Sequence, residues 1–309
     1  MKFTIYQGSR QGPRPYNQDR LAYSYSKDAL LMVLADGMGG HRHGEVAAQL
    51  AVKMLTDGFQ KAATPLLSNP SRFLNEQILE IHEAIDDIRK NNGLAESPRT
   101  TIVAAIVQGN FLYGAHVGDS RLYHFRNNEL LYRSEDHSVV QMLLRKGQIT
   151  QRDILLHPDR HKIYNCLGST TPPQVDLGQK RQLMDGDTVL LCTDGLWTTI
   201  NDIDISRTLH AGSIKLSAPK LLDKAEALCK KDGDNMSLIA MQWGDIANEK
   251  PAVHTGTMPL GATTTILNPN TYQLTVRNDA EVGTADDLSD EDIENAIADI
   301  QAAIQKNQG

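Results

Sequence analysis

Five acidic residues stand where apolar, strand-like runs of the sequence begin or end. Two of them precede such a run and three follow one. Carboxylates at strand ends can meet at one edge of a sheet, where they repel one another unless cations hold them. Ligation by oxygen atoms alone suits Mg²⁺ or Mn²⁺, so the pattern predicts a divalent metal site. The five residues are Asp19, Asp36, Asp119, Asp194 and Asp234.

The second of these carboxylates lies in the stretch 35–41, which reads Ala-Asp-Gly-Met-Gly-Gly-His. The apolar run 29–34 leads directly into it. Its glycines allow backbone carbonyl and amide groups to approach a ligand closely. Taken alone, however, Asp-Gly is an ordinary turn signal. The recurrence of carboxylates at other strand ends favours metal chemistry over a simple turn.

Length and composition exclude several classes of protein. The chain has 309 residues, enough for one large domain or two small ones. No apolar run is long enough to span a bilayer, and the N-terminus lacks the pattern of an export signal. Cys166, Cys192 and Cys229 are too few and too scattered for a disulfide framework or a zinc site. We expect reduced cysteines and a cytoplasmic protein.

The charge is distributed unevenly. The net charge is −7, and residues 246–309 carry all of it, because acidic and basic residues balance in the rest of the chain. Neither part has the basic stripe that a nucleic-acid surface requires. We therefore expect neither nucleic acid nor a membrane among the partners.

Hydrophobic patterning predicts an α+β protein. Helices with apolar stripes are expected over 44–61, from Ser71 onward, over 138–145 and over 217–230. Hairpin signals in series predict an antiparallel meander over 100–133. The long excursion 147–176 has the length of a functional lid, and we expect it to control substrate choice. Strands are expected over 3–6, 21–26, 29–35, 100–107, 111–117, 121–125, 129–133, 188–192 and 236–243.

The remaining motifs exclude other phosphate chemistries. A nucleotide-binding P-loop is missing from the sequence, and no cysteine is followed six residues later by the arginine of a thiol phosphatase. The stretch 202–206 resembles an aspartyl-nucleophile motif only superficially, since no apolar strand precedes it. We expect this stretch to begin a helix.

The end of the chain has a different character. Residues 246–288 contain threonines and prolines with little periodicity, which is typical of a linker. Residues 289–309 begin with a capping-box pattern and continue as an acidic amphipathic helix. Two interpretations stay open. The tail is either a solvated linker with a helix resting on the body, or a docking and regulatory segment phosphorylated at its threonines by a partner kinase.

Taken together in their order, the motifs resemble the bacterial kind of PPM-type, PP2C-like metal-dependent serine/threonine protein phosphatase. The resemblance covers residues 2–244 and implies a phosphatase domain over 1–245. It implies a four-layer αββα sandwich of two antiparallel sheets flanked by helices. The motifs are Arg14-x-x-Asn17-Gln18-Asp19, Ala35-Asp36-Gly37-Met38-Gly39-Gly40-His41, Thr100-Thr101, Gly118-Asp119-Ser120-Arg121, Asp136-His137-Ser138, Leu167-Gly168, Cys192-Thr193-Asp194-Gly195 and Gly233-Asp234-Asn235.

The resemblance also implies a centre of two Mn²⁺ or Mg²⁺ ions. Asp36 would bridge the two ions, and the carbonyl of Gly37 would complete one of them. Asp194 and Asp234 would bind the other, and Asp19 would contribute through a metal-bound water. These assignments come from the family pattern and not from the spacing of the residues.

A third, weaker ion and a phosphate-binding arginine are implied as well. Asp119 would help to hold the third ion, and Arg14 would grip the substrate phosphate. A water bridging two divalent ions loses its proton near neutral pH, and the hydroxide attacks phosphorus in line. Met38 stands where the eukaryotic branch has a histidine, so water or another residue, such as His41, must protonate the leaving group.

The resemblance predicts a hydrolase that removes phosphate from phosphoserine and phosphothreonine in proteins. Its expected partners are phosphorylated proteins and a serine/threonine kinase that acts on the same targets in signalling. Two alternatives were weighed against this activity. One is a phosphoprotein-binding module of the same fold without turnover, and the other is a hydrolase of small phosphomonoesters.

Overall fold

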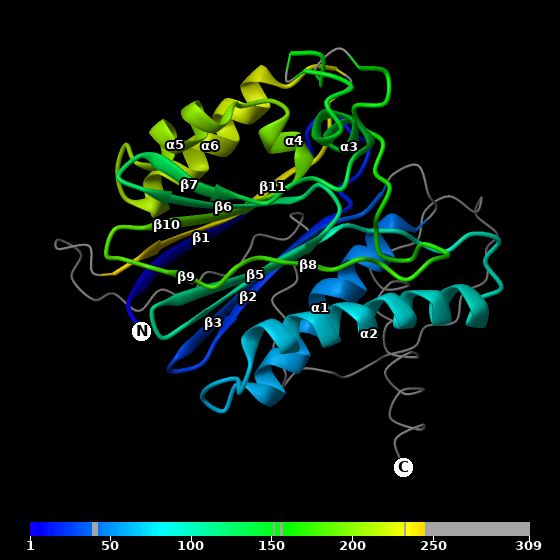
Figure 1. Ribbon diagram of the computed structural model, residues 1–309, viewed down its shortest axis with the longest axis horizontal. Helices are drawn as coiled ribbons and strands as arrows, with labels where there is room; N and C mark the ends of the chain where they lie inside the picture. Colours follow the sequence, from blue (N-terminus) through cyan, green and yellow to red (C-terminus); the bar gives the residue numbers. More distant parts are fainter. Residues whose placement is uncertain (39–42, 151, 155–156, 232, 245–309) are drawn as a thin grey trace, which may run out of the picture.

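Two antiparallel sheets lie face to face, and helices cover both outer surfaces (Figure 1). The structure is a computed structural model that describes residues 1–38, 43–150, 152–154, 157–231 and 233–244. The predicted linker 246–288 and the predicted helix 289–309 lie outside the described residues. The expected four-layer sandwich is confirmed for the part of the chain that the structure describes.

The two sheets draw their strands from different parts of the chain. One has the order β1-β11-β10-β6-β7, and the other has the order β2-β3-β4-β5-β8, with β9 also pairing with β5. The strands are β1 (Phe3–Arg10), β2 (Asp19–Tyr25), β3 (Ala29–Asp36), β4 (Ile102–Gln108), β5 (Phe111–Val117), β6 (Arg121–Arg126), β7 (Glu129–Arg133), β8 (Asp176–Leu177), β9 (Arg181–Gln182), β10 (Thr188–Cys192) and β11 (Met236–Trp243).

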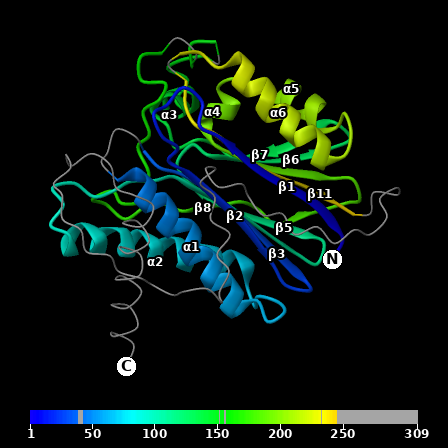
Figure 2. The same ribbon diagram turned by 180° about the vertical axis from the view of Figure 1, so that it is seen from behind.

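The helices form the two outer layers. α1 (Gly44–Ala62) and α2 (Pro70–Asn91) pack on the sheet that contains β3, as Figure 2 shows from behind. α5 (Asp202–Leu209) and α6 (Ile214–Leu228) lie over the sheet that contains β11, next to the short α4 (Asp194–Trp197). Ser138 caps the N-terminus of α3 (Val139–Arg145), and its side chain accepts a hydrogen bond from the Gln141 amide as expected of a cap. In the described part of the chain, none of the helices has the length and apolar character needed to cross a bilayer.

The alternation of side chains explains why β3 reads as a continuous apolar run. Leu31 and Val33 pack against α1 and α2, whereas Leu30, Met32 and Leu34 face the other sheet. Successive residues of a strand point to opposite faces, and both faces of this strand are buried. The strand therefore needs apolar residues at every position until it reaches Asp36 at the edge.

The predicted meander over 100–133 is wrong at its centre. β5 pairs with β4 in one sheet, whereas β6 pairs with β7 and β10 in the other, so the chain changes sheets between β5 and β6. Gly118 makes this crossing with a φ of +107°, a conformation that side chains rarely adopt. A glycine-containing turn signal does not distinguish a hairpin from a passage between two facing sheets.

The antiparallel pairing gathers several strand ends at one edge of the sandwich. β3 and β5 both run antiparallel to β4, so they end on the same side, where β2 begins. In the other sheet, Cys192 at the end of β10 pairs with Leu238 near the start of β11 and with Arg121 at the start of β6. This edge lies near α3 and α4 in Figure 1.

Candidate active site

All seven predicted site residues lie at this one edge. Each carboxylate stands at or next to a strand end, and the loop between β1 and β2 reaches the same place. His41, weighed as a proton donor, lies outside the described residues. The seven residues are Arg14, Asp19, Asp36, Gly37, Asp119, Asp194 and Asp234.

Asp36 is fixed through its backbone. Strand register places it directly opposite Asp19. Its amide donates to Thr101 Oγ1 at 3.2 Å, and its carbonyl accepts from Thr100 Oγ1 at 2.8 Å. Both hydrogen bonds involve the backbone of Asp36 and do not use its carboxylate. The backbone is thus held in place while the carboxylate oxygens can bind a metal.

Gly37 follows in a position that only glycine fits. Its amide donates to the carbonyl of Gln18 at 3.2 Å. A Cβ on Gly37 would lie 2.5 Å from the carbonyl carbon of Gly44 and 2.9 Å from the Gln18 oxygen. The close approach of the Gly44 and Gln18 backbones to Gly37 therefore depends on the absence of a side chain there.

The second sheet contributes Asp194 and ties it to the first sheet. Asp194 opens α4 directly after Thr193. The Thr193 hydroxyl donates to Asp19 Oδ2 at 3.0 Å and accepts from the amide of Ser237 at the same distance. One threonine thus joins β2, β10 and β11 at the site.

Arg14 lies beside Asp234 at the rim. Its Nη2 donates to Asp234 Oδ2 at 2.7 Å, and its Nε donates to the Gly233 carbonyl at 3.0 Å. The arginine side chain is 47% exposed, so it can meet a ligand that arrives from solvent. These two hydrogen bonds use Nε and Nη2, and neither of them uses Nη1. Nη1 is therefore available to bind such a ligand.

Asn235 secures the loop that carries Arg14, a role that the sequence did not reveal. Its side-chain nitrogen donates to the carbonyls of Gln11 at 2.8 Å and Tyr16 at 3.1 Å. Its side-chain oxygen accepts from the amide of Gln18 at 2.9 Å. The sequence signals for Asn235 were its place directly after Asp234 and its membership in the motif Gly233-Asp234-Asn235.

Trp197 performs a similar task for the loop of Asp119 and was not predicted. Its indole nitrogen donates to the Asp119 carbonyl at 3.0 Å, and its ring centre lies 3.5 Å from the Arg121 guanidinium carbon. Arg121 forms two hydrogen bonds of 2.7 Å to the buried Asp136. A tryptophan three residues after Asp194, in the same short helix, was the available signal.

The electrostatics of the carboxylates favour a cation at this edge. Burial, followed by neighbouring carboxylates, raises the pKa of Asp36 and of Asp194 well above the ordinary value. Burial also raises the pKa of Asp19 to about 6 and that of Asp119 to about 7. One oxygen of Asp19, of Asp119 and of Asp194 is buried without a hydrogen-bond partner among the described residues. Buried oxygens of this kind are costly unless a cation binds them, so the residues fit divalent ions.

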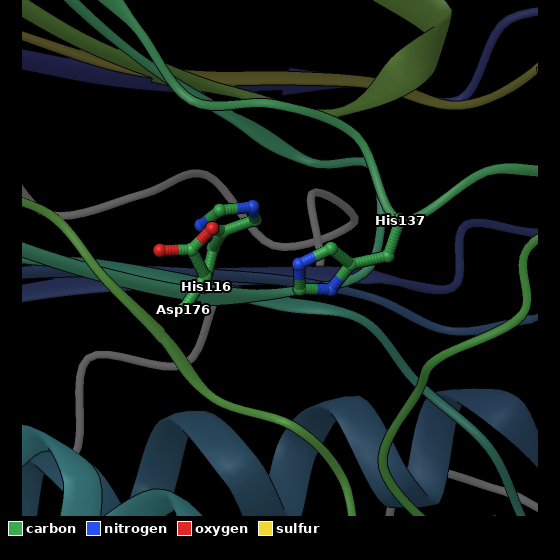
Figure 3. A group of neighbouring side chains, drawn as sticks. All are labelled: His116, His137 and Asp176. Atoms are coloured by element: carbon green, nitrogen blue, oxygen red, sulfur yellow. The ribbon is translucent and has the colours of Figure 1, made fainter. Parts of the chain in front are cut away.

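A second cluster, formed by His116, His137 and Asp176, lies nearby (Figure 3). Among the described residues it is the one set of three histidine, cysteine or acidic side chains whose ligand atoms all lie within 4.8 Å of one another. The side chains come from β5, from the segment before α3 and from β8. The two imidazole rings stack with centres 4.6 Å apart.

The hydrogen bonds of His137 argue against a metal in that cluster. Its Nδ1 accepts from the Gly118 amide at 3.2 Å and from the Asn165 side-chain nitrogen at 2.8 Å. The Asn165 amide group is oriented by a pair of bonds to the Gln174 backbone. A neutral His137 therefore carries its proton on Nε2, and the lone pair of Nδ1 already accepts hydrogen bonds. A metal-ligating histidine needs a free lone pair on its unprotonated nitrogen, which His137 does not offer in this arrangement.

His137 instead connects the Asp119 loop to the excursion. Its backbone amide donates to the Gly118 carbonyl at 3.0 Å, and its carbonyl accepts from the Tyr164 amide at 3.0 Å. Burial and the nearby His116 lower the pKa of His137 to about 4, so it stays a neutral acceptor at physiological pH. His137 thus links the loop that carries Asp119 to the excursion 147–176.

The chain is similar to known proteins in sequence and in structure. The sequence model of the Protein phosphatase 2C family matches residues 10–220. A serine/threonine phosphatase, stp, of Listeria welshimeri is 32% identical over 229 residues, which cover 73% of this chain and 90% of the relative.

The solved structures that resemble this chain include serine/threonine phosphatases as well. The serine/threonine phosphatase Stp1 of Staphylococcus aureus aligns with a TM-score of 0.72 and 28% identity, over 79% of this chain and 96% of that one. The catalytic domain of the phosphatase PstP, in complex with two manganese ions, aligns with a TM-score of 0.66 and 29% identity. That alignment covers 78% of this chain and 97% of the PstP domain.

We expect Mn²⁺ to stabilise the protein more at pH 8 than at pH 5.5. Asp19 and Asp119 hold protons in the folded state up to pH about 6 and about 7, against 3.8 for an ordinary Asp carboxyl. As pH rises through these values, the metal-free fold must accept buried charges, and its free energy of unfolding falls. Saturating Mn²⁺ should then raise the melting temperature by about 5–10 °C at pH 8 and by clearly less at pH 5.5.

Thermal unfolding with Mn²⁺ and with EDTA, at each pH, checks this expectation. The lowered pKa of His137 acts in the opposite direction, but it affects both samples and cancels in their difference. Asp194→Asn should abolish the rise in melting temperature that Mn²⁺ causes, whereas Asp223→Asn, an exposed change on α6, should retain it. An increment that is equal at both pH values would contradict the proposed charge cluster.

We expect His137→Ala to weaken metal binding, because it releases the loop of Asp119. The midpoint of the weakest Mn²⁺ binding step, measured by calorimetry, should rise about tenfold, as is typical when a group that orients a ligand is lost. His137→Asn can restore an acceptor for the Gly118 amide and should recover part of the loss. A lower melting temperature with unchanged Mn²⁺ binding would show that His137 only supports the fold.

Proposed function

Since the chain belongs to the protein phosphatase 2C family, we propose how the residues at this edge carry out its reaction. The reaction is the metal-dependent removal of phosphate from phosphoserine and phosphothreonine in proteins, so the chain is a hydrolase. The observation that carries the mechanism is the set of buried carboxylate oxygens without a hydrogen-bond partner among the described residues, beside an exposed arginine.

In this proposal, Asp36 would hold both of two divalent ions. Its strand position opposite Asp19, with no hydrogen bond from a described residue to its carboxylate, supports that role. The Gly37 carbonyl would help to hold one ion, and Asp194 and Asp234 would help to hold the other. Asp19 acts through water, which agrees with the bond that its Oδ2 already accepts from Thr193.

Asp119 would help to hold a third, weaker ion. Its loop joins the two sheets, and its Oδ1, which no described residue contacts by a hydrogen bond, supports a ligand role. Oxygen ligands suit both Mn²⁺ and Mg²⁺. We favour Mn²⁺ as the ion for assays because the PstP catalytic domain was solved with manganese.

The two ions, when bound, would supply a nucleophile by lowering the pKa of water at the site. Arg14 binds the substrate phosphate. Asp234 and the Gly233 carbonyl hold its Nη2 and Nε, which directs the guanidinium and leaves Nη1 for a non-bridging phosphate oxygen. A charged donor of this kind stabilises the extra negative charge of the transition state more than that of the bound substrate.

The proposal extends to partners and location. Phosphorylated proteins are the substrates, and a serine/threonine kinase that modifies the same proteins would complete a signalling pair. Free cysteines at Cys166, Cys192 and Cys229 agree with a reducing cytoplasm. The excursion 147–176 would influence substrate choice, and its backbone contact with His137 places part of it beside the Asp119 loop. No observation favours the binding module or the small-phosphomonoester hydrolase.

We expect Asp36→Asn to abolish turnover of a phosphothreonine peptide in Mn²⁺, because it removes the shared anionic ligand. Excess EDTA should abolish wild-type turnover in the same way. Phosphate release and Mn²⁺ calorimetry measure the two effects, and Asp223→Asn serves as the control. Wild-type activity that survives chelation would refute a metal-dependent mechanism.

We expect Arg14→Ala to lower kcat/KM on the same peptide by roughly 10²–10³, the usual cost of losing such a donor. Arg10→Ala is the matched control, since Arg10 pairs with Asp223 and Glu226 on the surface near this loop. It should retain activity within about threefold, as expected for a surface ion pair. If Arg14→Ala behaved like the control, Arg14 would have no role at the phosphate.

A further inference from the structure

A cavity of about 340 Å³ opens beside the Arg14 loop, outside the carboxylate cluster. One wall is the stretch before Arg14, and the other is the end of α6 with the residues that follow it. No step of the proposed mechanism uses this cavity. Its lining residues are Gly12, Pro13, Glu226, Cys229, Lys230 and Lys231.

The cavity shares both of its walls with the phosphate-binding site. Pro13 directly precedes Arg14 in the chain, and consecutive Cα atoms lie about 3.8 Å apart. On the other wall, the segment that carries Lys230 and Lys231 continues to Gly233, whose carbonyl accepts from Arg14 Nε at 3.0 Å. A peptide whose phosphorylated residue lies at Arg14 would therefore pass the cavity with its next few residues.

The cavity wall carries two lysines and one carboxylate, and the lysine ammonium groups are available to a ligand. Lys230 and Lys231 are exposed, and neither forms an ion pair with a described residue. The one carboxylate on the wall, Glu226, lies 3.6 Å from the Arg10 side chain, which also pairs with Asp223. Asp232 follows the lysines in the chain but lies outside the described residues.

Besides the charged side chains, the cavity is lined by Gly12, Pro13 and Cys229. The sulfur of Cys229 packs closely against Gly233. A Cβ atom added to Gly233 would lie only 2.1 Å from this sulfur. Pro13 offers apolar surface on the opposite wall. A short side chain with an anionic end can place its carbon atoms on this surface and its charge near the lysines.

We infer that this cavity is a specificity subsite for an anionic side chain within about three residues of the phosphorylated residue, given about 3.3 Å of reach per extended residue. The anion is the carboxylate of an aspartate or glutamate, or a second phosphoryl group, since a lysine ammonium binds either as a point charge. The inference rests on the proposed function, because it concerns the substrates of the same site.

Steady-state kinetics of the full chain in Mn²⁺ test the subsite. The substrates are phosphothreonine peptides of one length that carry aspartate, asparagine or phosphoserine at each of the three positions on either side. Wild type should prefer one or more acidic placements over asparagine by about tenfold in kcat/KM, the scale of two exposed ion pairs. Separate arms for aspartate and phosphoserine show which anion the subsite favours.

Replacing both lysines then assigns the preference to the cavity. K230A/K231A should erase the acidic preference through a higher KM, while kcat and the asparagine peptides change little. Charge reversal in K230E/K231E should invert the preference for acidic peptides. The control K61E/K220E alters two exposed lysines on α1 and α6 and should leave this preference unchanged. Because exposed charges are screened by salt, the wild-type preference should also shrink in roughly 0.5 M NaCl.

The outcomes separate the subsite from the phosphatase activity. Failure of wild type to hydrolyse any peptide in Mn²⁺ would overturn the proposed function itself. Normal hydrolysis without an acidic preference, or a preference that survives K230E/K231E, would overturn the subsite alone. Equal losses on acidic and neutral peptides in K230A/K231A would also overturn it, because they would indicate a structural role for the lysines. Hydrolysis of a small aryl phosphate should be unchanged in every variant.

Discussion

The burial of like charges at one edge of the sandwich is the constraint on which the rest of this structure depends. Asp19 and Asp119 are buried, and neighbouring carboxylates contribute to the raised pKa of each. Such groups destabilise a fold unless ions or hydrogen bonds offset the cost. The surrounding residues hold the carboxylates in place through their backbones, as Thr100 does for Asp36, and so keep their oxygens available. The edge is therefore arranged for a ligand at some expense in stability of the metal-free protein.

The sandwich also explains how distant segments reach one place. Strands of alternating direction return the chain to the same edge, and two facing sheets double the number of strand ends available there. Thr193 and Trp197 then fix the two sheets against each other at the site. The Arg14 loop and the segment around Tyr164, which we propose to face the substrate, are attached to this frame by Asn235 and by His137. These attachments matter because catalysis requires the reacting groups to be held within a fraction of an ångström of their productive positions.

Much of this arrangement could be predicted from the sequence, because its signals are local. The apolar run of β3 and its abrupt end at Asp36 placed a carboxylate at a strand end, and the resemblance supplied the roles. The passage between the sheets at Gly118 was not predictable from the turn signal, since partner choice depends on contacts far along the chain. The same holds for Asn235, which bonds to Gln11 across 224 positions. Trp197 reads locally as an ordinary apolar residue of a short helix, and only the fold brings Asp119 to its indole nitrogen.

The central claim is that separate carboxylates at this edge bind a pair of divalent ions. A crystal structure of the protein grown with Mn²⁺, with anomalous difference maps at the manganese edge, tests it most directly. We expect two strong peaks that share Asp36, one near the Gly37 carbonyl and the other near Asp194 and Asp234, with any weaker peak at Asp119. Manganese bound instead between His116, His137 and Asp176, or absent from the strand ends in a crystal that holds it elsewhere, would contradict a metal centre formed by these carboxylates.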